Sequence, residues 1–546
     1  MDSNQGRVIA NVVHVYERRI FSGEITWRDG VISTVTERGE PDPSAPFLLP
    51  GFIDAHVHIE SSMLTPSEFA RIACRHGTVA TVSDPHEIVN VLGLHGFRFM
   101  VENASQSQMP IYFGAPSCVP ATPFETAGAQ LDSAQLESLF QNQSATYLSE
   151  MMNYPGVLNN APDITAKINL AKRYGVTIDG HAPGLVGEDA LRYAQAGIST
   201  DHECRTLEEA EAKLSAGMHI LIREGSAARN FDALHPLISR YPDKVMFCSD
   251  DKHPDDLVAG HINSLAARAV AEGHELFDVL RCACINPIHH YHLPLGQLRV
   301  GDRMDTVEVK NLQNFSVIRT WIAGRKVAEN GISLLSRAKT IPINAFNARP
   351  ITPADLDVEH RDHKIRVIKT LDGELITKEI LCTPKVLAHK IVADPARDIL
   401  LLTVVNRYRP AKPALAFIQG FGLRQGALAS SVAHDSHNII AVGTDADAVC
   451  RAVNRIIAAK GGIALATTDG VELLPLPIAG LMSDGEGDWV AARYADLDRL
   501  AKDLGSTLRA PFMTLSFMAL LVVPELKLSD LGLFDGRTFQ FTSLTV

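Results

Sequence analysis

The sequence predicts an α/β chain built around a (β/α)8 TIM-type barrel, with a small composite β domain from both flanks and a separate C-terminal α+β domain. Three observations lead to this fold class. Eight apolar segments alternate with helical segments over about 240 residues, which is typical of a parallel barrel. Short strand patterns with turn signals lie on both sides of this stretch. The pattern changes once more from residue 346 onward.

The two flanks of the barrel are expected to form one small β domain, made of residues 1–50 and 296–345. Their strand patterns lie at residues 7–16, 20–27, 31–36, 301–309 and 316–327. Turn signals such as Asp29-Gly30 separate the strands. About forty residues of antiparallel sheet cannot close a good core alone, so the first flank needs the second.

The barrel is predicted over residues 51–295. Its strands are expected at residues 51–58, 78–84, 111–115, 146–150, 176–181, 198–202, 218–222 and 245–250. Helices are expected between them, for example at residues 67–76, 164–174, 207–215 and 261–272. The carboxyl ends of all the strands of such a barrel meet at one rim, where active sites lie.

The remaining residues, 346–546, are expected to form the C-terminal domain. Strands at 365–370 and 399–405 precede a glycine-rich stretch, and a helix is expected at 445–460. Between them lies the polar segment 434–437, His-Asp-Ser-His, in an apolar neighbourhood. Its two histidines, His434 and His437, either pack this domain or cover the active site.

Side chains that bind metals or carry protons lie at the ends of six of the eight predicted barrel strands. They are His56, His58, Asp84, His86, Glu150, His181, His202 and Asp250. Such groups cost free energy when they are buried, unless they are paired or bound to a metal. Their arrangement at one rim therefore predicts a functional site.

The first predicted strand offers one pair of metal ligands. Residues i and i+2 of a strand face the same side, so His56 and His58 would present two imidazoles to one ion. Asp250 would be a further ligand of this ion.

A second ion is predicted next to the first, held by His181 and His202, with Glu150 as the bridge between the two ions. Paired divalent ions are a common device for activating water. Nitrogen and oxygen ligands without thiolate suit manganese or iron, and zinc as well, and the sequence does not choose among them.

Asp84 and His86 have two interpretations. The sequence Asp-Pro-His at a strand end can simply cap the following helix. Because both residues share the rim with the predicted ligands, we favour a supporting or proton-transfer role.

The composition excludes several classes of protein. The net charge is −12, and no long Lys/Arg patch indicates nucleic-acid binding. No apolar run approaches the roughly 20 residues of a membrane span, and the first residues lack a secretion signal. The eight cysteines are scattered without a Cys-x-x-Cys pair, which indicates reduced thiols in a cytoplasmic protein.

Seven segments carry a resemblance to a known family. They are residues 50–63, 83–88, 149–157, 179–184, 200–203, 249–257 and 430–439. In these segments, in the β flanks and in the eight-stranded centre, the chain resembles the amidohydrolase superfamily, and most closely its adenine deaminases of the bacterial type. The match covers nearly the whole chain.

The resemblance implies hydrolysis of adenine to hypoxanthine and ammonia at a binuclear iron or manganese centre, a step of purine salvage. The partner would be this small-molecule purine, with no nucleic acid and no membrane, and we expect a homo-oligomer such as a dimer. Asp250 would take a proton from the attacking water and pass it to the departing nitrogen. Glu150, Asp84 and His86 complete the expected catalytic set.

Two other functions remain open. A cyclic amidase or another amidohydrolase, such as a dihydroorotase-like enzyme, would be favoured by a bridging carboxylated lysine at the end of the fourth strand, where this chain has Glu150. A metal-free scaffold protein would be indicated by missing ligands, but all six predicted ligands are present.

Overall fold

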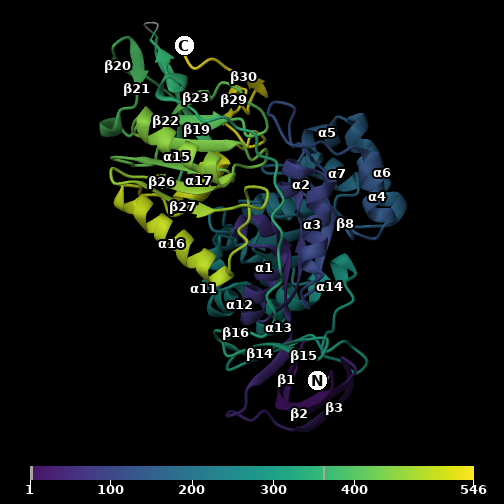
Figure 1. Ribbon diagram of the computed structural model, residues 1–546. Helices are drawn as coiled ribbons and strands as arrows, with labels where there is room; N and C mark the ends of the chain where they lie inside the picture. Colours follow the sequence, from purple (N-terminus) through teal and green to yellow (C-terminus); the bar gives the residue numbers. More distant parts are fainter. Residues whose placement is uncertain (1–3, 361–362) are drawn as a thin grey trace.

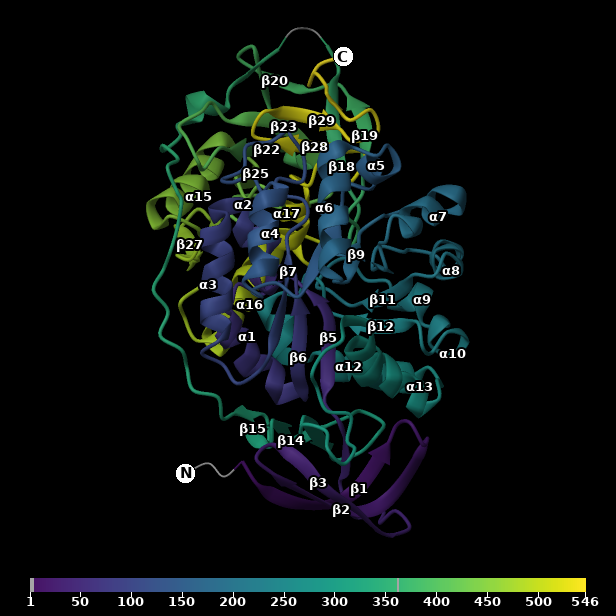
Figure 2. The same cartoon turned by 90° about the vertical axis from the view of Figure 1, so that its right-hand side faces the viewer.

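The chain is arranged in three parts (Figure 1). The computed structural model describes residues 4–360 and 363–546. A small sheet near the N-terminus lies at one end, the barrel lies in the middle, and the C-terminal sheet with its helices lies at the other end (Figure 2). Residues 334–352 contain no helix or strand and run along the outside of the barrel from the small sheet to the C-terminal part.

The small sheet contains strands from both flanks of the barrel. Its strands are β1 (Gly6–His14), β2 (Arg19–Arg28), β3 (Val31–Gly39), β4 (Phe47–Pro50), β13 (Thr306–Val309), β14 (Val317–Ile322), β15 (Arg325–Glu329) and β16 (Ile332–Ser333). They are arranged in the order β16-β15-β14-β13-β4-β1-β2-β3. Strand β4 joins the flanks, because it pairs in parallel with β1 and antiparallel with β13.

The centre of the chain is the predicted eight-stranded barrel. Its strands are β5 (Phe52–Val57), β6 (Thr78–Ser83), β7 (Ile111–Ala115), β8 (Tyr147–Met151), β9 (Ile178–Gly180), β10 (Thr200–Asp201), β11 (His219–Arg223) and β12 (Val245–Cys248). Strands β5 to β9 and β10 to β12 form two parallel runs. A parallel bridge between Val57 and Asp250 joins the last strand to the first. The predicted fold class is confirmed.

Helices surround the barrel. They are α1 (Pro66–Ala73), α2 (His86–Leu92), α3 (Leu94–Ala104), α4 (Ser133–Gln141), α5 (Tyr154–Leu158), α6 (Pro162–Tyr174), α7 (Gly187–Gln195), α8 (Leu207–Ser215), α9 (Phe231–Leu234), α10 (Leu237–Arg240), α11 (Pro254–Ala259), α12 (Ile262–Ala271), α13 (Leu276–Leu280) and α14 (Asn286–Tyr291). Local sequence sets their ends. Helix α6, for example, begins at Pro162 and stops at Gly175, whose φ of 66° suits a residue without a side chain.

The C-terminal part contains a second large sheet. In spatial order its strands are β19 (Thr377–Cys382), β18 (Ile365–Thr370), β23 (Ala414–Gln419), β22 (Leu400–Val405), β25 (Ile439–Gly443), β24 (Ala427–Ser430), β26 (Gly462–Ala466) and β27 (Val471–Pro475). Its helices are α15 (Ala446–Ala459), α16 (Gly487–Asp503) and α17 (Pro511–Phe517), and its smaller strands are β17 (Val358–Glu359), β20 (Lys385–Leu387), β21 (Lys390–Val392), β28 (Leu526–Ser529), β29 (Gly532–Asp535) and β30 (Gln540–Phe541). The predicted helix at 445–460 agrees with α15 within one residue at each end.

The C-terminal part packs directly on the barrel. One continuous cluster of buried apolar side chains contains barrel residues such as Ile53 and Val82 together with Leu428 and Leu476 of the C-terminal part. Helix α16 lies against α11, and an ion pair of 2.9 Å joins Asp488 to Arg75. In the described residues, no helix is both long and apolar enough to cross a membrane.

Candidate metal centre

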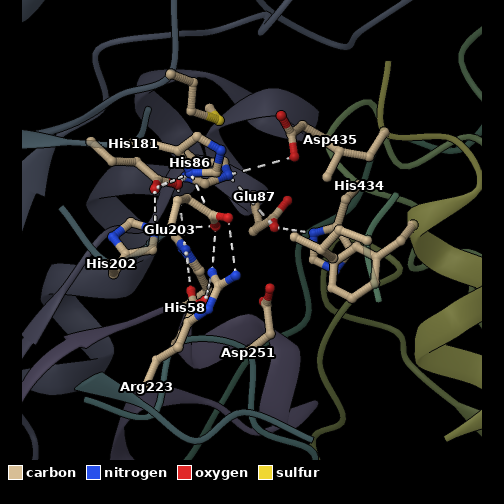
Figure 3. Close-up of a pocket in the computed structure, with 16 residues that line it drawn as sticks. His58, His86, Glu87, His181, His202, Glu203, Arg223, Asp251, His434 and Asp435 are labelled. Atoms are coloured by element: carbon tan, nitrogen blue, oxygen red, sulfur yellow. Dashed lines mark hydrogen bonds and ion pairs between the residues drawn. The ribbon is translucent and has the colours of Figure 1, made fainter. Parts of the chain in front are cut away.

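The carboxyl ends of the barrel strands surround a buried cavity (Figure 3). Sixteen residues line it, and all but four of them are ionisable. The barrel supplies most of the lining from its strand ends, its loops and helix α2, and the C-terminal part supplies the rest, including His434 and Asp435 on the side opposite His181 and His202. The cavity is therefore complete only where the two parts pack together.

The two histidines at the end of β5 face one point. Their Nε2 atoms lie 3.2 Å apart. Asp250 Oδ1 lies 3.6 Å from His56 Nε2 and 3.3 Å from His58 Nε2. Two nitrogens that bind one ion at about 2.1 Å lie about 3.0–3.4 Å apart, so this group has the spacing of a cation site.

Glu150 of β8 lies between two groups of histidines. Its Oε2 lies 3.0 Å from both His181 Nδ1 and His202 Nε2, and its Oε1 lies 3.5 Å from His58 Nε2. Burial alone would raise the pKa of Glu150, but the neighbouring imidazoles of His181 and His202 hold this pKa well below its ordinary value. One oxygen of an ionised carboxylate thus faces each group.

Asp84 follows β6, and His86 begins α2. Asp84 Oδ1 accepts a hydrogen bond of 3.1 Å from the backbone N–H of His86, and Asp84 Oδ2 lies 3.1 Å from His86 Nδ1. Burial lowers the pKa of His86, but the carboxylates of Asp84 and Glu87 raise it well above its ordinary value. Asp84 therefore makes both contacts at once: Oδ1 binds the first backbone N–H of α2, and Oδ2 faces the His86 imidazole that lines the cavity.

Arg223 and Glu203 were absent from the predicted site. Arg223 donates a hydrogen bond of 2.6 Å to Asp250 Oδ2 and pairs with both carboxylate oxygens of Glu203. Because Arg223 occupies Oδ2, the other oxygen of Asp250 is left facing the histidines of β5. Burial raises the pKa of Asp250, but the Arg223 guanidinium and His58 hold it well below its ordinary value. Strand β11 ends at Arg223, one residue beyond the predicted strand, so the strand-end rule applied with the correct boundary would have found this residue.

The segment 434–437 contacts the barrel at Glu87. His434 Nδ1 and His437 Nε2 each bond to a different carboxylate oxygen of this residue. Burial lowers the pKa of His434, but the carboxylates of Glu87 and Asp251 raise it to about 9. His434 and Asp435 line the cavity, whereas His437 is fully buried outside the lining. The two interpretations given for this segment are thus both consistent with its position.

Other polar residues near the rim have different surroundings. Asp251 lines the cavity, but His253 packs on the ring of Tyr494, with 4.5 Å between ring centroids. Ser117 donates a hydrogen bond to the backbone oxygen of Glu150, and neither Ser117 nor Cys118 lines the cavity. Ser117 therefore supports the strand that carries Glu150.

The donor set fits divalent cations. Several groups of three or more His, Asp and Glu side chains have ligand atoms within 4.8 Å of one another, and all these groups are buried. Among the described residues, His56 Nδ1, both ring nitrogens of His86 and His181 Nε2 have no hydrogen-bond partner. Buried polar atoms without partners are costly, but these nitrogens differ from the ring atoms at the candidate cation site, because His56 faces it through Nε2 and His181 approaches Glu150 through Nδ1. The fit to a cation therefore depends on the grouping and the chemistry of the donor atoms. The first ligand shell contains nitrogen and oxygen only, which suits manganese, iron or zinc.

Comparison with known proteins agrees with this geometry. Residues 47–327 match the profile described as Amidohydrolase family, and residues 374–540 match the profile described as Adenine deaminase C-terminal domain. The chain is 52% identical over 538 residues to an adenine deaminase of Salinibacter ruber, with 98% of both chains covered. It belongs to the amidohydrolase family, and within it to the adenine deaminase family. The identity to adenine deaminases of a Sulfurovum species and of Methanosarcina mazei is 52% and 50%, over 97% and 98% of this chain and 98% of each relative.

Membership of the amidohydrolase family, together with the buried ligand cluster, supports the use of divalent metal. It also confirms the resemblance found in the sequence. The individual roles of the eight predicted site residues stay predictions at this stage, although the structure brings all of them to one rim.

A second cavity, of about 560 Å³, adjoins the first. The two share Glu203, Arg223 and Leu375 as walls. Part of its lining is apolar and comes from the C-terminal part, including Val522 and Val523. Glu203, Arg223 and Leu375 therefore lie where the two cavities meet.

Proposed function

We propose that this chain hydrolyses adenine to hypoxanthine and ammonia with two divalent ions, manganese or iron, in the cavity at the barrel rim. The strongest support is the convergence of the six predicted ligands at one buried rim, in a chain about half identical to adenine deaminases over nearly its whole length. The homo-oligomer expected from the sequence stays a prediction.

The ligands divide into two groups with one shared member. His56, His58 and Asp250 would hold one ion, and His181 with His202 would hold the other. Glu150 would bridge them, because its oxygens face the two groups separately. When bound, divalent ions lower the pKa of water and so supply a nucleophile near neutral pH.

Asp250 is the residue best placed to move protons. Its Oδ2 is held by Arg223, so Oδ1 is the oxygen that would contact both the first ion and the reacting groups. The reaction removes one proton from water and adds one to the departing amine, which leaves as ammonia rather than as an anion. A single carboxylate that faces both atoms can perform both transfers.

Asp84 and His86 would assist on the neighbouring side. The imidazole of His86 lies 3.1 Å from Asp84 Oδ2, 3.6 Å from Glu150 Oε1 and 3.6 Å from Glu87 Oε1. Surrounded by carboxylates, a protonated His86 would stabilise negative charge that develops on the purine ring during attack. Removal of His86 should therefore lower turnover more than it lowers the affinity for metal.

A cyclic amidase is disfavoured by the bridging position. Enzymes with a carboxylated lysine need a lysine whose side chain reaches both ions. At the end of β8 this chain has Glu150, and the nearby Lys167 instead donates to the backbone oxygen of Ser117 and pairs with Asp163. Glu150 already supplies two oxygens, so no carbon dioxide is required.

The test offers four compounds at equal concentration: adenine, adenosine, dihydroorotate and a cyclic urea. Ammonia release is measured for the two purines, and ring opening, followed by chromatography of the product, is measured for dihydroorotate and the cyclic urea. We expect adenine to react, with little release from adenosine, because a ribose on the ring would have to fit a cavity closed by the C-terminal part. Comparable specificity constants for adenine and adenosine would contradict the assignment to the free base. Reaction of dihydroorotate alone would favour the cyclic amidase.

A further inference from the structure

The side of the active cavity contributed by the C-terminal part has an apolar surface. Leu375, Phe517 and Leu520 line it, and we call these three residues the roof. The ring of Phe517 stacks on the imidazole of His434, with 5.0 Å between centroids and 27° between planes. A flat apolar surface of this kind suits the face of an aromatic base, since bases stack on aromatic side chains.

The roof consists of two separate segments of chain. Leu375 lies in the turn between β18 and β19, whereas Phe517 ends α17 and Leu520 follows it. Neither segment is part of the barrel, so the distance between the roof and the metal ligands depends on how these segments are held.

Strand β28 connects the two segments through Lys527, the second of its four residues. The Lys527 ammonium donates to the backbone oxygens of Leu375, at 2.6 Å, and of Phe517, at 2.9 Å. These are the backbone oxygens of two roof residues. Backbone contacts of the same strand reinforce the connection, because Leu528 N–H donates to Met518 O and Leu526 N–H donates to Thr377 Oγ1.

Joining the two segments through the Lys527 ammonium costs free energy, because a charged group is buried. Its side chain is 0% exposed, and no carboxylate of the described residues lies within ion-pair distance of it. Burial lowers its pKa to about 7. A methionine would fill similar space without the cost of burying an unpaired charge. The donors of the ammonium, rather than its volume, are therefore what this position requires.

We propose that Lys527 is a positioning residue that holds the two segments of the apolar roof together over the metal centre, where the roof would contact the purine ring. The proposal rests on the proposed function and narrows its substrate class. A roof held in place presents an apolar surface that suits the face of an aromatic base. Lys527 does not touch the reacting atoms, so its removal should weaken binding of the base more than it slows the chemical step.

The experiment compares three variants of the metal-loaded full chain with wild type. Lys527→Met removes the donors and keeps the length, and Lys527→Arg restores donors. Val453→Ala in α15 is the matched control, because Val453 is fully buried in the same domain but does not line the cavity. The measurements are kcat and KM for adenine, metal content, and hydrogen exchange of residues 371–376 and 517–521.

We expect Lys527→Met to raise KM by about tenfold or more, with a smaller change in kcat, normal metal content and faster exchange in both segments. Lys527→Arg should return KM most of the way to the wild-type value. Val453→Ala should change neither KM nor hydrogen exchange in these segments. Unchanged KM and unchanged exchange in Lys527→Met would overturn the proposal while the deaminase function stands. If wild type fails to deaminate adenine, the proposed function fails, and the exchange of the two segments still decides whether Lys527 holds them.

Discussion

Raising the pH from 7 to 9 should stabilise this protein through Lys527. Burial lowers the pKa of this lysine from its ordinary value of 10.5 to about 7. The unfolded chain therefore holds the proton more tightly than the folded chain between these two values. Stability rises with pH wherever the unfolded state binds more protons, so the gain begins near pH 7 and ends near pH 10.5. Below pH 7 both states are protonated, and this residue adds no pH dependence.

The size of the effect follows from the shift. One pKa unit corresponds to about 1.4 kcal/mol, so the whole shift is worth about 5 kcal/mol. Between pH 7 and pH 9 the gain should be about 2 kcal/mol, since the lysine is half deprotonated at the start of the interval.

The assay is the free energy of unfolding by urea at pH 7, 8 and 9, for wild type and for Lys527→Met. The difference between the two proteins cancels the titration of other groups that both contain. We expect the free energy of unfolding of wild type to increase relative to that of the variant as the pH rises. Parallel curves would mean that Lys527 titrates near 10.5 in the folded protein, and the description of an unpaired buried ammonium would then be wrong.

Two further changes test the site itself. Glu150→Gln keeps the size of the side chain but removes its charge, so metal content, turnover or both should fall. Wild type should load metal equally well in buffers purged of carbon dioxide, and a strong bicarbonate requirement would argue for a carboxylated lysine bridge. His437→Ala removes one of the two histidines that bond to the buried Glu87, and loss of such a charge-assisted bond should lower kcat/KM by about 10–100-fold with metal content intact. Kinetics identical to wild type would reduce the segment 434–437 to a packing role.

The barrel could be predicted from sequence because its strands are buried on both faces. Strands such as β5 and β6 have no exposed residue, so they read as apolar runs, and β7 was predicted at its observed boundaries. The candidate ligands followed, since parallel strands present their carboxyl ends at one rim. Strand β10 has only two residues, Thr200 and Asp201, but His202 next to it still lies at the rim.

The contacts made by the C-terminal domain could not be predicted in the same way. His434 and Glu87 are 347 residues apart in sequence, and no local period links them. Lys527 resembles an ordinary surface residue in sequence, because a single lysine in a short strand gives no sign of burial. Arg223 is a different case, since an error of one residue in a strand boundary removed it from the predicted set.

The number of metal ions needed for turnover tests the central claim most directly. Metal-free protein would be titrated with manganese, or anaerobically with iron(II), while bound metal per chain and adenine deamination are measured on the same samples. We expect activity to rise with bound metal and to level off close to two ions per chain. His181→Ala and His202→Ala should bind less metal and lack turnover under the same conditions. Full activity in a sample that demonstrably carries one ion per chain would contradict the two-ion site bridged by Glu150.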